Sequence, residues 1–241
     1  MNIESNITVN GLQVKVQRKS IKNLHLGVYP PSGRVRMAVP LAVSDGAVRR
    51  AVIGKLGWIK RQQKRFRDQP RQSKREMISG ESHYFLGGRY RLKVIHVDTK
   101  SKIILKNKAN LELYTSVGSR VEEREQVLYS WYRQRLKEMI PPLLDQWQRR
   151  IGVAVPFWGV KRMKTKWGSC NVATRRIWLN LELTKKPQHC LEYILVHELV
   201  HLLERHHNER FVGLMDKFLP RWRFYKEELN CFPLSHSEWQ Y

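Results

Sequence analysis

The sequence predicts an α+β protein, in which a basic, strand-rich N-terminal region with one helix precedes a helical region built on a small antiparallel sheet. Short segments of alternating apolar and polar residues, separated by Gly, Pro and Asn, occupy residues 7–40 and 82–114. Apolar residues recur at helical spacing over residues 120–150, and apolar residues dominate residues 191–203. We therefore expect two domains, 1–115 and 116–241, in a chain long enough to bury a core.

Two turn signals define the strands of the first region. Residues 8–16 alternate in hydrophobicity around Asn10-Gly11, a pair that favours a tight hairpin. Residues 25–29 and 34–39 flank the turn Pro30-Pro31-Ser32-Gly33. Each turn therefore predicts two strands, one on either side of it.

A basic helix is expected from about residue 44 to residue 67, with Ser44 or Asp45 as its N-cap. Its apolar stripe consists of Val48, Val52, Leu56, Ile59 and Phe66. The remaining surface is cationic, because residues 49–75 contain eleven Lys and Arg and one acid, Asp68. A polar linker is expected over residues 68–79.

Further strands and a long helix follow. The strands are expected at 82–86, 90–97, 102–105 and 111–114, with a Gly87-Gly88 turn after the first. An amphipathic helix is expected over residues 120–150, and Pro141-Pro142 would kink or break it. A strand at 153–163, a hairpin at 167–180 and a terminal helix at 211–229 complete the prediction.

The segment His197-Glu198-Leu199-Val200-His201 carries the most specific chemistry. Residues four apart share one face of a helix, so both imidazoles can point at one ion. Glu198 lies about 100° further round and can reach a metal-bound water without ligating the metal. The helix is apolar on nearly every side, so its polar groups would be costly to desolvate without a metal. Imidazole ligands with an open fourth position suit catalytic Zn²⁺.

His207 is the expected third ligand. On a continuous helix it would lie about 120° off the metal face and about 9 Å further along, so the helix must end near Glu204 to His206. The turn lacks Gly and Pro, and His206 or Asn208 would best tolerate a left-handed conformation. Glu204 is the rival ligand, but about 10.5 Å of helix rise separates it from His197. It better suits a role as acceptor for a ligand N–H, while His206 is either exposed or donates to the substrate.

Three motifs, in one order, resemble the YgjP-like metallopeptidase domain, a relative of the SprT-like zincins. They are Trp167-Gly168-Ser169-Cys170-Asn171, Arg176-Ile177-Trp178-Leu179-Asn180, and the stretch HELVHLLERHHNERF that ends at Phe211. The resemblance runs from about Val160 to about Leu229, and more loosely from residue 10 onward. It implies a zincin-like catalytic domain with the H-E-x-x-H helix packed on the sheet.

The resemblance also implies roles for individual residues. It implies that His197, His201 and His207 bind Zn²⁺ and that Glu198 is the catalytic glutamate. Contacts with the ligand rings or the substrate are expected from Glu204, His206, Trp167 and Cys170. Cys170 suits a small buried role better than catalysis. In zincins a strand beside the metal helix holds an extended peptide, and here Ile177–Leu181 is the candidate.

This chain departs from the family pattern at two places. The family commonly has Asn-His-Ser around the third ligand, whereas this chain has His206-His207-Asn208. It also has Val212 where an aromatic residue usually follows the Phe. Neither change removes a ligand, but both leave the local turn less defined.

The net charge of +24 is concentrated in the first half of the chain. Residues 1–110 contain 24 Lys and Arg against 6 Asp and Glu, and the remaining residues contain 21 against 15. A cationic surface with so few acids is typical of proteins that bind nucleic acid or another polyanion. We expect such a partner for the basic region, beside a peptide or protein substrate for the catalytic region.

The cytoplasm is the expected location. No run of about 18 apolar residues occurs, so no membrane segment is expected. The first six residues lack the basic and apolar regions of a signal peptide. Cys170, Cys190 and Cys231 form an odd, scattered set that suits a reducing compartment.

Zinc-assisted hydrolysis of peptide bonds is the leading interpretation, with Glu198 passing the water's proton to the leaving amine. The oxyanion-stabilising group could be Arg162, Lys166, Tyr193 or His206. One alternative is a metal-dependent pyrophosphatase acting on nucleotides such as UTP, an activity associated with the family, although three imidazoles suit zinc better than magnesium. Another is a nucleic-acid-binding protein with a zinc site, or a protease recruited to nucleic acid.

Overall fold

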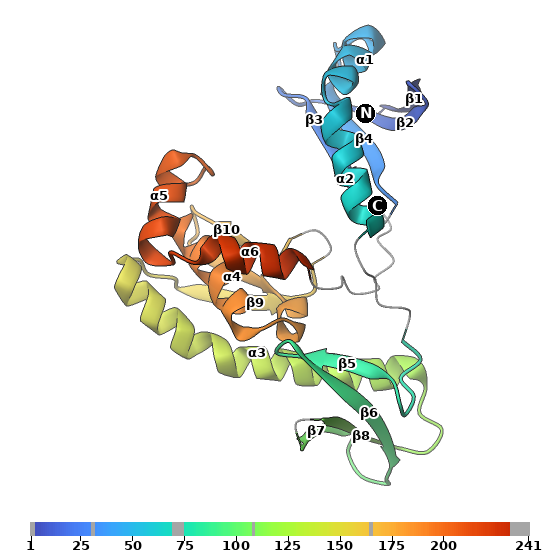
Figure 1. Cartoon of the computed structure of the whole chain (residues 1–241), viewed down its shortest axis with the longest axis vertical. Coiled ribbons are helices and arrows are strands. Elements are labelled where there is room, and N and C mark those ends of the chain that lie inside the picture. The colour runs from blue at the N-terminus through green and yellow to red at the C-terminus, as the bar shows by residue number, and fades with distance from the viewer. Residues whose placement is uncertain (1–2, 30–31, 69–74, 108, 164–165, 232–241) are drawn as a thin grey trace. The chain divides into compact units, whose positions relative to one another are not determined.

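The computed structural model describes residues 3–29, 32–68, 75–107, 109–163 and 166–231. These ranges contain six α-helices and three small sheets (Figure 1), so the α+β class is confirmed. The chain forms two compact units, one of residues up to 71 and one that begins at residue 72. Half of the predicted linker, residues 69–74, lies outside the described residues, as does the Pro30-Pro31 pair.

The first unit is a four-stranded sheet covered by two helices. Its strands are β1 (Ile3–Val9), β2 (Leu12–Lys19), β3 (His25–Tyr29) and β4 (Arg34–Pro40), in the order β1-β2-β4-β3. Asn10 and Gly11, with φ values of 48° and 76°, form the predicted hairpin between β1 and β2. The strands β2 and β4 run parallel. Apolar side chains of the sheet pack against Val48, Val52 and Ile59, which gives this unit its own core.

The predicted basic helix is two helices, α1 (Asp45–Gly54) and α2 (Leu56–Asp68). The Ser44 side chain caps α1 by accepting a hydrogen bond from the Ala47 N–H. At the other end the Lys55 N–H bonds to the carbonyl of Val52, which closes the helix. A single helix was the wrong prediction because Gly54 and Gly57, on either side of Lys55, have low helix propensity.

The second sheet belongs to the second unit. Its strands are β5 (Ser82–Phe85), β6 (Gly88–His96), β7 (Lys102–Lys106) and β8 (Asn110–Thr115), in the order β5-β6-β8-β7. Its inward side chains, including Leu92 and Leu113, join one core with the helix α3 (Val121–Ile151). The Tyr132 hydroxyl of α3 donates to the carbonyl of Tyr84 at 2.8 Å. The compact units therefore divide at 71/72, earlier than the predicted 115/116, because this sheet buries its apolar face against α3.

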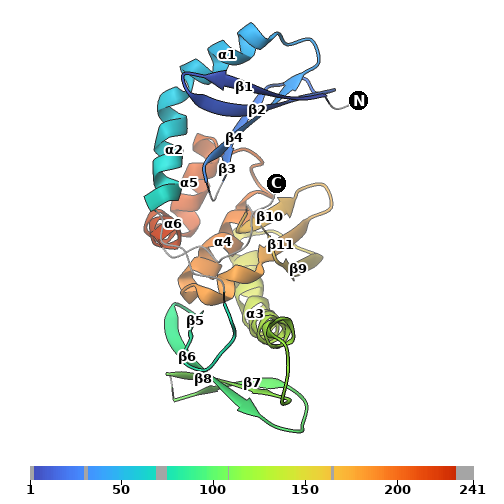
Figure 2. The same cartoon turned by 90° about the vertical axis from the view of Figure 1, so that its right-hand side faces the viewer.

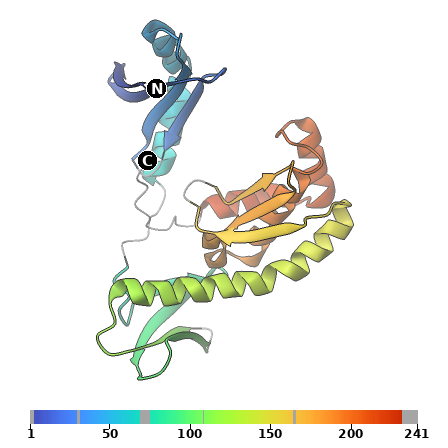
Figure 3. The same ribbon diagram turned by 180° about the vertical axis from the view of Figure 1, so that it is seen from behind.

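Helix α3 does not break at Pro141-Pro142. Figure 3 shows instead that its axis bends in the second half of its length, as expected where prolines remove main-chain hydrogen bonds. Its buried residues recur every three or four positions and are Leu128, Tyr132, Leu136, Ile140, Leu144, Trp147 and Ile151. The helix thus presents one continuous apolar stripe to the rest of the unit.

The third sheet is mixed rather than antiparallel. Its strands are β9 (Phe157–Lys161), β10 (Gly168–Asn171) and β11 (Arg176–Asn180), in the order β10-β11-β9. The pair β10 and β11 is antiparallel, as the predicted hairpin requires, but β9 runs parallel to β11. The prediction failed here because the direction of β9 depends on its pairing with β11, a distant segment, which the local pattern does not encode.

A short 3₁₀ helix and three α-helices end the described chain. They are η1 (Leu181–Lys185), α4 (Gln188–Val200), α5 (Glu209–Phe218) and α6 (Trp222–Cys231). The predicted terminal helix at 211–229 is therefore two helices. Leu219, with φ −137° and ψ 72°, leaves the helical conformation, as expected for a residue that precedes a proline, here Pro220.

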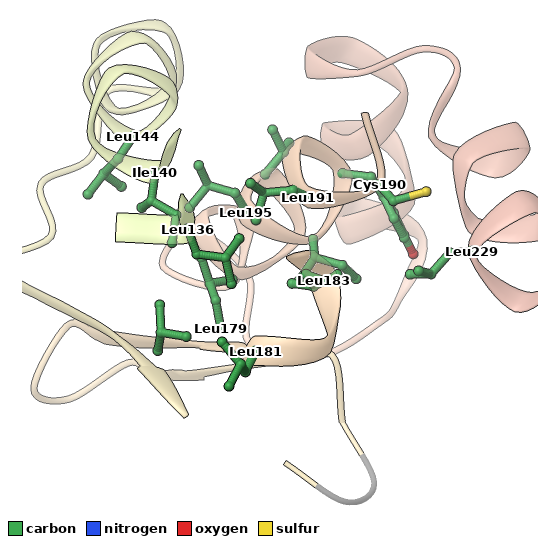
Figure 4. Packing of buried hydrophobic residues seen from close by; sticks show 14 of the residues in the cluster. Leu136, Ile140, Leu144, Leu179, Leu181, Leu183, Cys190, Leu191, Leu195 and Leu229 are labelled. Carbon is green, nitrogen blue, oxygen red and sulfur yellow. The ribbon is translucent and has the colours of Figure 1, made fainter. Parts of the chain in front are cut away.

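Helix α4 lies inside the second unit. Figure 2 shows it between the sheet of β9–β11 and helix α6. Leu191 and Leu195 on α4 face Leu136 and Ile140 on α3 (Figure 4). This all-round burial explains why α4 is apolar on nearly every side, and it holds the polar residues of α4 at fixed positions. Among the described residues, no helix has both the length and the apolar character to cross a membrane.

Candidate metal centre

Three histidine rings converge at the end of α4. His197 lies in its last turn, His201 follows directly, and His207 comes from the loop before α5. One ring nitrogen from each lies within 4.8 Å of the others. The Nε2 atoms of His197 and His207 are 3.0 Å apart. Two nitrogen ligands of a tetrahedral zinc ion lie roughly 3.3 Å apart, so one ion could bridge these rings with little rearrangement.

The turn that returns His207 to this cluster begins earlier than predicted. Helix α4 ends at Val200, and the N–H groups of Leu203 and Glu204 both bond to the Val200 carbonyl at 2.9 Å. The residues with positive φ include none between α4 and α5, so the left-handed residue predicted at His206 or Asn208 is wrong. Asn208 is extended, with φ −92°, and caps α5 by accepting the Phe211 N–H at 3.0 Å.

Two neighbours fix the orientation of the rings. His201 Nδ1 lies 3.1 Å from the Glu204 carbonyl oxygen. Because a carbonyl can only accept, Nδ1 carries the proton and Nε2 is free to bind a metal. The Phe211 ring packs against all three imidazoles, with centroid distances of 4.9, 4.8 and 4.7 Å.

All three imidazoles favour the neutral form. Burial, with smaller contributions from the other two rings, lowers the pKa of His197 to about 3. Burial also lowers the pKa values of His201 and His207 below the ordinary histidine value. The positive charge of Lys226 on α6 acts in the same direction on His197 and His207. Neutral rings offer the lone pairs that a metal ion requires.

Glu198 is a buried carboxyl beside these rings, with 5% of its surface exposed. Burial raises its pKa to about 8, opposed by the charge of Lys166 and by a hydrogen bond from the Cys170 N–H. A divalent cation on the rings would add positive charge nearby and favour the carboxylate. The donor set and the buried carboxyl together fit a catalytic metal.

The strand β10 approaches Glu198 so closely that only glycine fits at one position. A Cβ atom added to Gly168 would lie 2.5 Å from Glu198 Oε1. Real Cβ atoms essentially never come this close to another heavy atom. Gly168 therefore sets the position of the carboxyl, together with the Cys170 N–H that donates to it.

A pocket of about 490 Å³ opens beside the metal centre and follows β10 into the turn after it. Its walls are Lys166, Gly168, Ser169, Cys170, Asn171, Val172, Ala173, Glu198, His201 and Arg205. Lys166 and Arg205 give it positive charge. The pocket thus joins the glutamate and one histidine to the edge of the sheet.

The predicted peptide-binding strand must be corrected. Ile177–Leu181 corresponds largely to β11, whose main chain pairs with β10 on one side and with β9 on the other. The edge strands of this sheet are β9 and β10, and β10 is the one whose residues line the pocket. The Asn180 N–H donates to the Trp167 carbonyl at 2.9 Å, so by alternation the main-chain groups of Gly168 and Cys170 point away from β11.

The other residues predicted to contact the ligand rings or the substrate differ in their positions relative to the site. Glu204 lies outside the cluster of three histidines: its carbonyl accepts from His201, and its carboxylate accepts from the His206 N–H at 3.1 Å. His206 is exposed and does not line the pocket. Cys170 does line it, and burial raises the pKa of its thiol to about 11. Trp167 packs against the core, with Lys186 Nζ 5.5 Å from its ring centroid.

Of the predicted oxyanion-stabilising side chains, Lys166 alone lines the pocket. Arg162 lies over the Tyr129 ring, 4.5 Å from its centroid, and is directed elsewhere. Tyr193 is buried beside His197, with ring centroids 6.0 Å apart.

Sequence reasoning missed three contributors to the site, namely Gly168, Phe211 and Lys226. A glycine inside a strand, here the first residue of β10, is a recognisable signal for close approach. Phe211 follows His207 by four residues, but its contact with the rings depends on the turn between them. Lys226 had no signal in the sequence, because α6 meets the site only in the folded unit.

Comparisons with known proteins identify the family of the chain. A model of the YgjP-like metallopeptidase domain matches residues 22–232. No curated protein matches the chain. Among solved structures, the metallopeptidase zymogen abylysin of Pyrococcus abyssi is similar with 22% sequence identity and a TM-score of 0.34. That match covers 36% of this chain and 89% of the other.

Proposed function

The chain belongs to the YgjP-like family of metallopeptidase domains, and from this premise we propose that it is a zinc-dependent peptidase of the H-E-x-x-H type. The observation that carries the proposal is the convergence of three neutral imidazoles beside one buried carboxyl. Three nitrogen ligands and an open position are typical of catalytic zinc, whereas structural zinc usually has four protein ligands.

In the proposed mechanism, His197, His201 and His207 would hold the zinc. Bound zinc would supply an acidified water and a Lewis acid for the substrate carbonyl. Glu198 would take a proton from that water and deliver it to the leaving amine. Burial raises the pKa of this carboxyl in the metal-free protein, and a cation on the rings would favour its carboxylate form, which is the form that can accept a proton. Lys166 lines the same pocket, which supports a role for it in stabilising negative charge on the substrate.

We expect Gly168→Ala to lower peptidase activity roughly 100-fold, because shifting a catalytic group by about 1 Å can cost that factor. The added methyl group would displace the Glu198 carboxyl, while the three zinc ligands stay in place. Gly213→Ala is the matched control, since a Cβ there meets nothing within 4 Å. Zinc content and kcat/KM of both variants check the prediction. Full activity in Gly168→Ala would show that the close approach does not position Glu198.

The substrate in this proposal is an extended peptide that pairs with the outer edge of β10. The outward carbonyls of Gly168 and Cys170 can accept substrate N–H groups there. N-methylation of single peptide nitrogens near the scissile bond should lower kcat/KM by roughly 2- to 10-fold for each hydrogen bond lost. Methylation several residues away should have no effect. Insensitivity at every position near the scissile bond would argue against pairing with β10.

The basic residues Lys166 and Arg205 line the pocket and could bind nucleotide phosphates, as the pyrophosphatase alternative requires. Activity assays with and without metal distinguish a peptidase from a pyrophosphatase. The purified protein should cleave casein, lose this activity to a zinc chelator, and regain it with added Zn²⁺. Nucleoside triphosphates under the same conditions should release no pyrophosphate. Zinc-dependent pyrophosphate release without casein cleavage would favour the alternative.

We also propose that α1 and α2 dock the protein on nucleic acid. Their exposed cationic residues are Arg49, Arg50, Lys60, Arg61, Lys64 and Arg67. Trp58, with 36% of its surface exposed, lies among them and offers an aromatic face for stacking. Asp45 is the one acid of α1.

Binding of duplex DNA or RNA should therefore weaken steeply with salt, with a log-log slope of about −0.9 for each phosphate contacted. The triple variant Lys60→Glu, Arg61→Glu and Lys64→Glu should reduce both the affinity and the slope. Fluorescence anisotropy across a salt series measures both quantities. Equal binding by the variant, or no binding at low salt, would remove this proposal.

The cytoplasm is the proposed compartment. Cys170 and Cys190 are free thiols in the part of the chain that the structure describes, which suits a reducing environment. Fractionation of cells that express the tagged protein tests this proposal, and recovery from an oxidising compartment would contradict it.

A further inference from the structure

A second cluster of ligand-type side chains lies at the opposite end of α4. His189 and Cys190 occupy its first turn, and Glu228 lies on α6. One ligand atom from each lies within 4.8 Å of the others. We propose that these three residues form a second metal site, which fastens the start of α4 to α6. The inference does not rest on the proposed peptidase function.

The cluster joins two helices through contacts that are already in place. The His189 ring packs on Tyr225 of α6, with centroids 4.9 Å apart. Its Nε2 also forms a hydrogen bond with the Glu228 carboxylate. The Cys190 side chain is fully buried. Figure 4 shows its sulfur pointing away from Leu191, toward the side of the cluster where Leu229 of α6 lies.

The three donors match one class of ion. A thiolate, an imidazole nitrogen and a carboxylate suit Zn²⁺ and similar transition metals, whereas Mg²⁺ and Ca²⁺ prefer oxygen alone. Tetrahedral zinc sets its ligand atoms roughly 3.3–3.7 Å apart, so small rotations of the side chains would close the site. The His189 and Glu228 side chains are 35% and 29% exposed, which lets a metal and a water ligand enter from solvent.

An ion pair beside a core cysteine is the competing explanation. The His189–Glu228 pair accounts for two of the three residues without a metal, and a buried free cysteine is common in protein cores. This explanation does not require the sulfur to lie within 4.8 Å of the Glu228 carboxylate on the other helix. It also predicts that Cys190 never binds an added metal, which is measurable.

The second site would act on the catalytic centre through two elements. His189 and His197 lie on the same helix, about 12 Å apart along its axis. On α6, Lys226 lies two residues from Glu228, and its charge acts on His197 and His207. A metal that joins α4 to α6 would therefore fix both elements without touching the substrate.

Cobalt substitution distinguishes the two sites, because the proposed second site contains sulfur and the three-histidine site does not. Titration of the metal-free protein with Co²⁺ should give two equivalents bound and a thiolate-to-cobalt charge-transfer band in the near ultraviolet. Cys190→Ser should abolish the band and remove one equivalent. Glu228→Gln should weaken the second equivalent at least tenfold. Cys170→Ser and Cys231→Ser are the controls and should keep the band.

The variant His201→Ala separates metal binding at the second site from metal binding at the three-histidine site. His201→Ala should remove the other equivalent and leave the charge-transfer band intact, even if the peptidase proposal fails. In that background, added Zn²⁺ should raise the melting temperature, and Glu228→Gln should cancel the rise. Circular dichroism checks that each variant is folded. A protein that binds one equivalent without the band, or keeps the band in Cys190→Ser, would overturn the second site.

Discussion

Replacing Glu198 with Gln is expected to lower kcat/KM for a peptide substrate by about 10²- to 10⁴-fold, the usual contribution of a general base. The amide has nearly the same shape as the carboxyl, but it cannot take a proton from the water. The Cys170 N–H that donates to the carboxyl can still donate to the amide oxygen. Zinc content should therefore stay at the wild-type level, because Glu198 does not belong to the ligand cluster. Steady-state kinetics and elemental analysis of the same sample measure both outcomes.

The matched control is Glu227→Gln, which makes the same chemical change at an exposed position on α6. Its activity should equal that of the wild-type protein. Retained zinc with full activity in Glu198→Gln would remove the general-base role. Loss of zinc in that variant would instead place the carboxyl among the ligands, which would contradict the assignment of three imidazoles.

Replacing His207 with Ala is expected to abolish peptidase activity and weaken zinc binding more than about 100-fold, since even the partner of a ligand can contribute 10- to 100-fold. His207 is the ligand that sequence spacing could least secure, because it lies beyond the end of α4. The structure places its Nε2 3.0 Å from that of His197. Competition with a chromophoric zinc chelator measures the affinity.

Two neighbours of His207 provide controls for this prediction. His206→Ala changes the adjacent histidine, which is exposed and outside the metal cluster, so zinc affinity should be unchanged. Glu204→Gln tests the rival ligand, and its effect should be small because the His201 ring bonds to the main-chain carbonyl rather than to the carboxylate. Zinc loss in Glu204→Gln with zinc retained in His207→Ala would reverse the assignment of the third ligand.

The sequence was sufficient for the local features of the site. The four-residue spacing of His197 and His201 places both rings on one face of any helix, whatever surrounds it. The apolar residues around them predicted the burial that the structure shows. Spacing favoured His207 over its rival Glu204 only if the helix ended before it, and the resemblance to the family implied the same three ligands.

The sequence was insufficient wherever distant segments decide the outcome. The direction of β9 and the free edge of β10 depend on how three strands pair, which their own residues do not specify. The unit boundary at 71/72 depends on the burial of the second sheet against α3. The turn before His207 also formed without the left-handed residue that the local pattern predicted, because the tight turn after Val200 already redirects the chain.

Anomalous X-ray diffraction at the zinc absorption edge, from a crystal of protein purified without added metal, tests the central claim most directly. One peak should lie about 2.0–2.1 Å from the Nε2 atoms of His197, His201 and His207, with Glu198 beside it and not bonded to it. No peak among these three rings, in protein whose peptidase activity is intact, would contradict a mechanism that depends on zinc held by His197, His201 and His207.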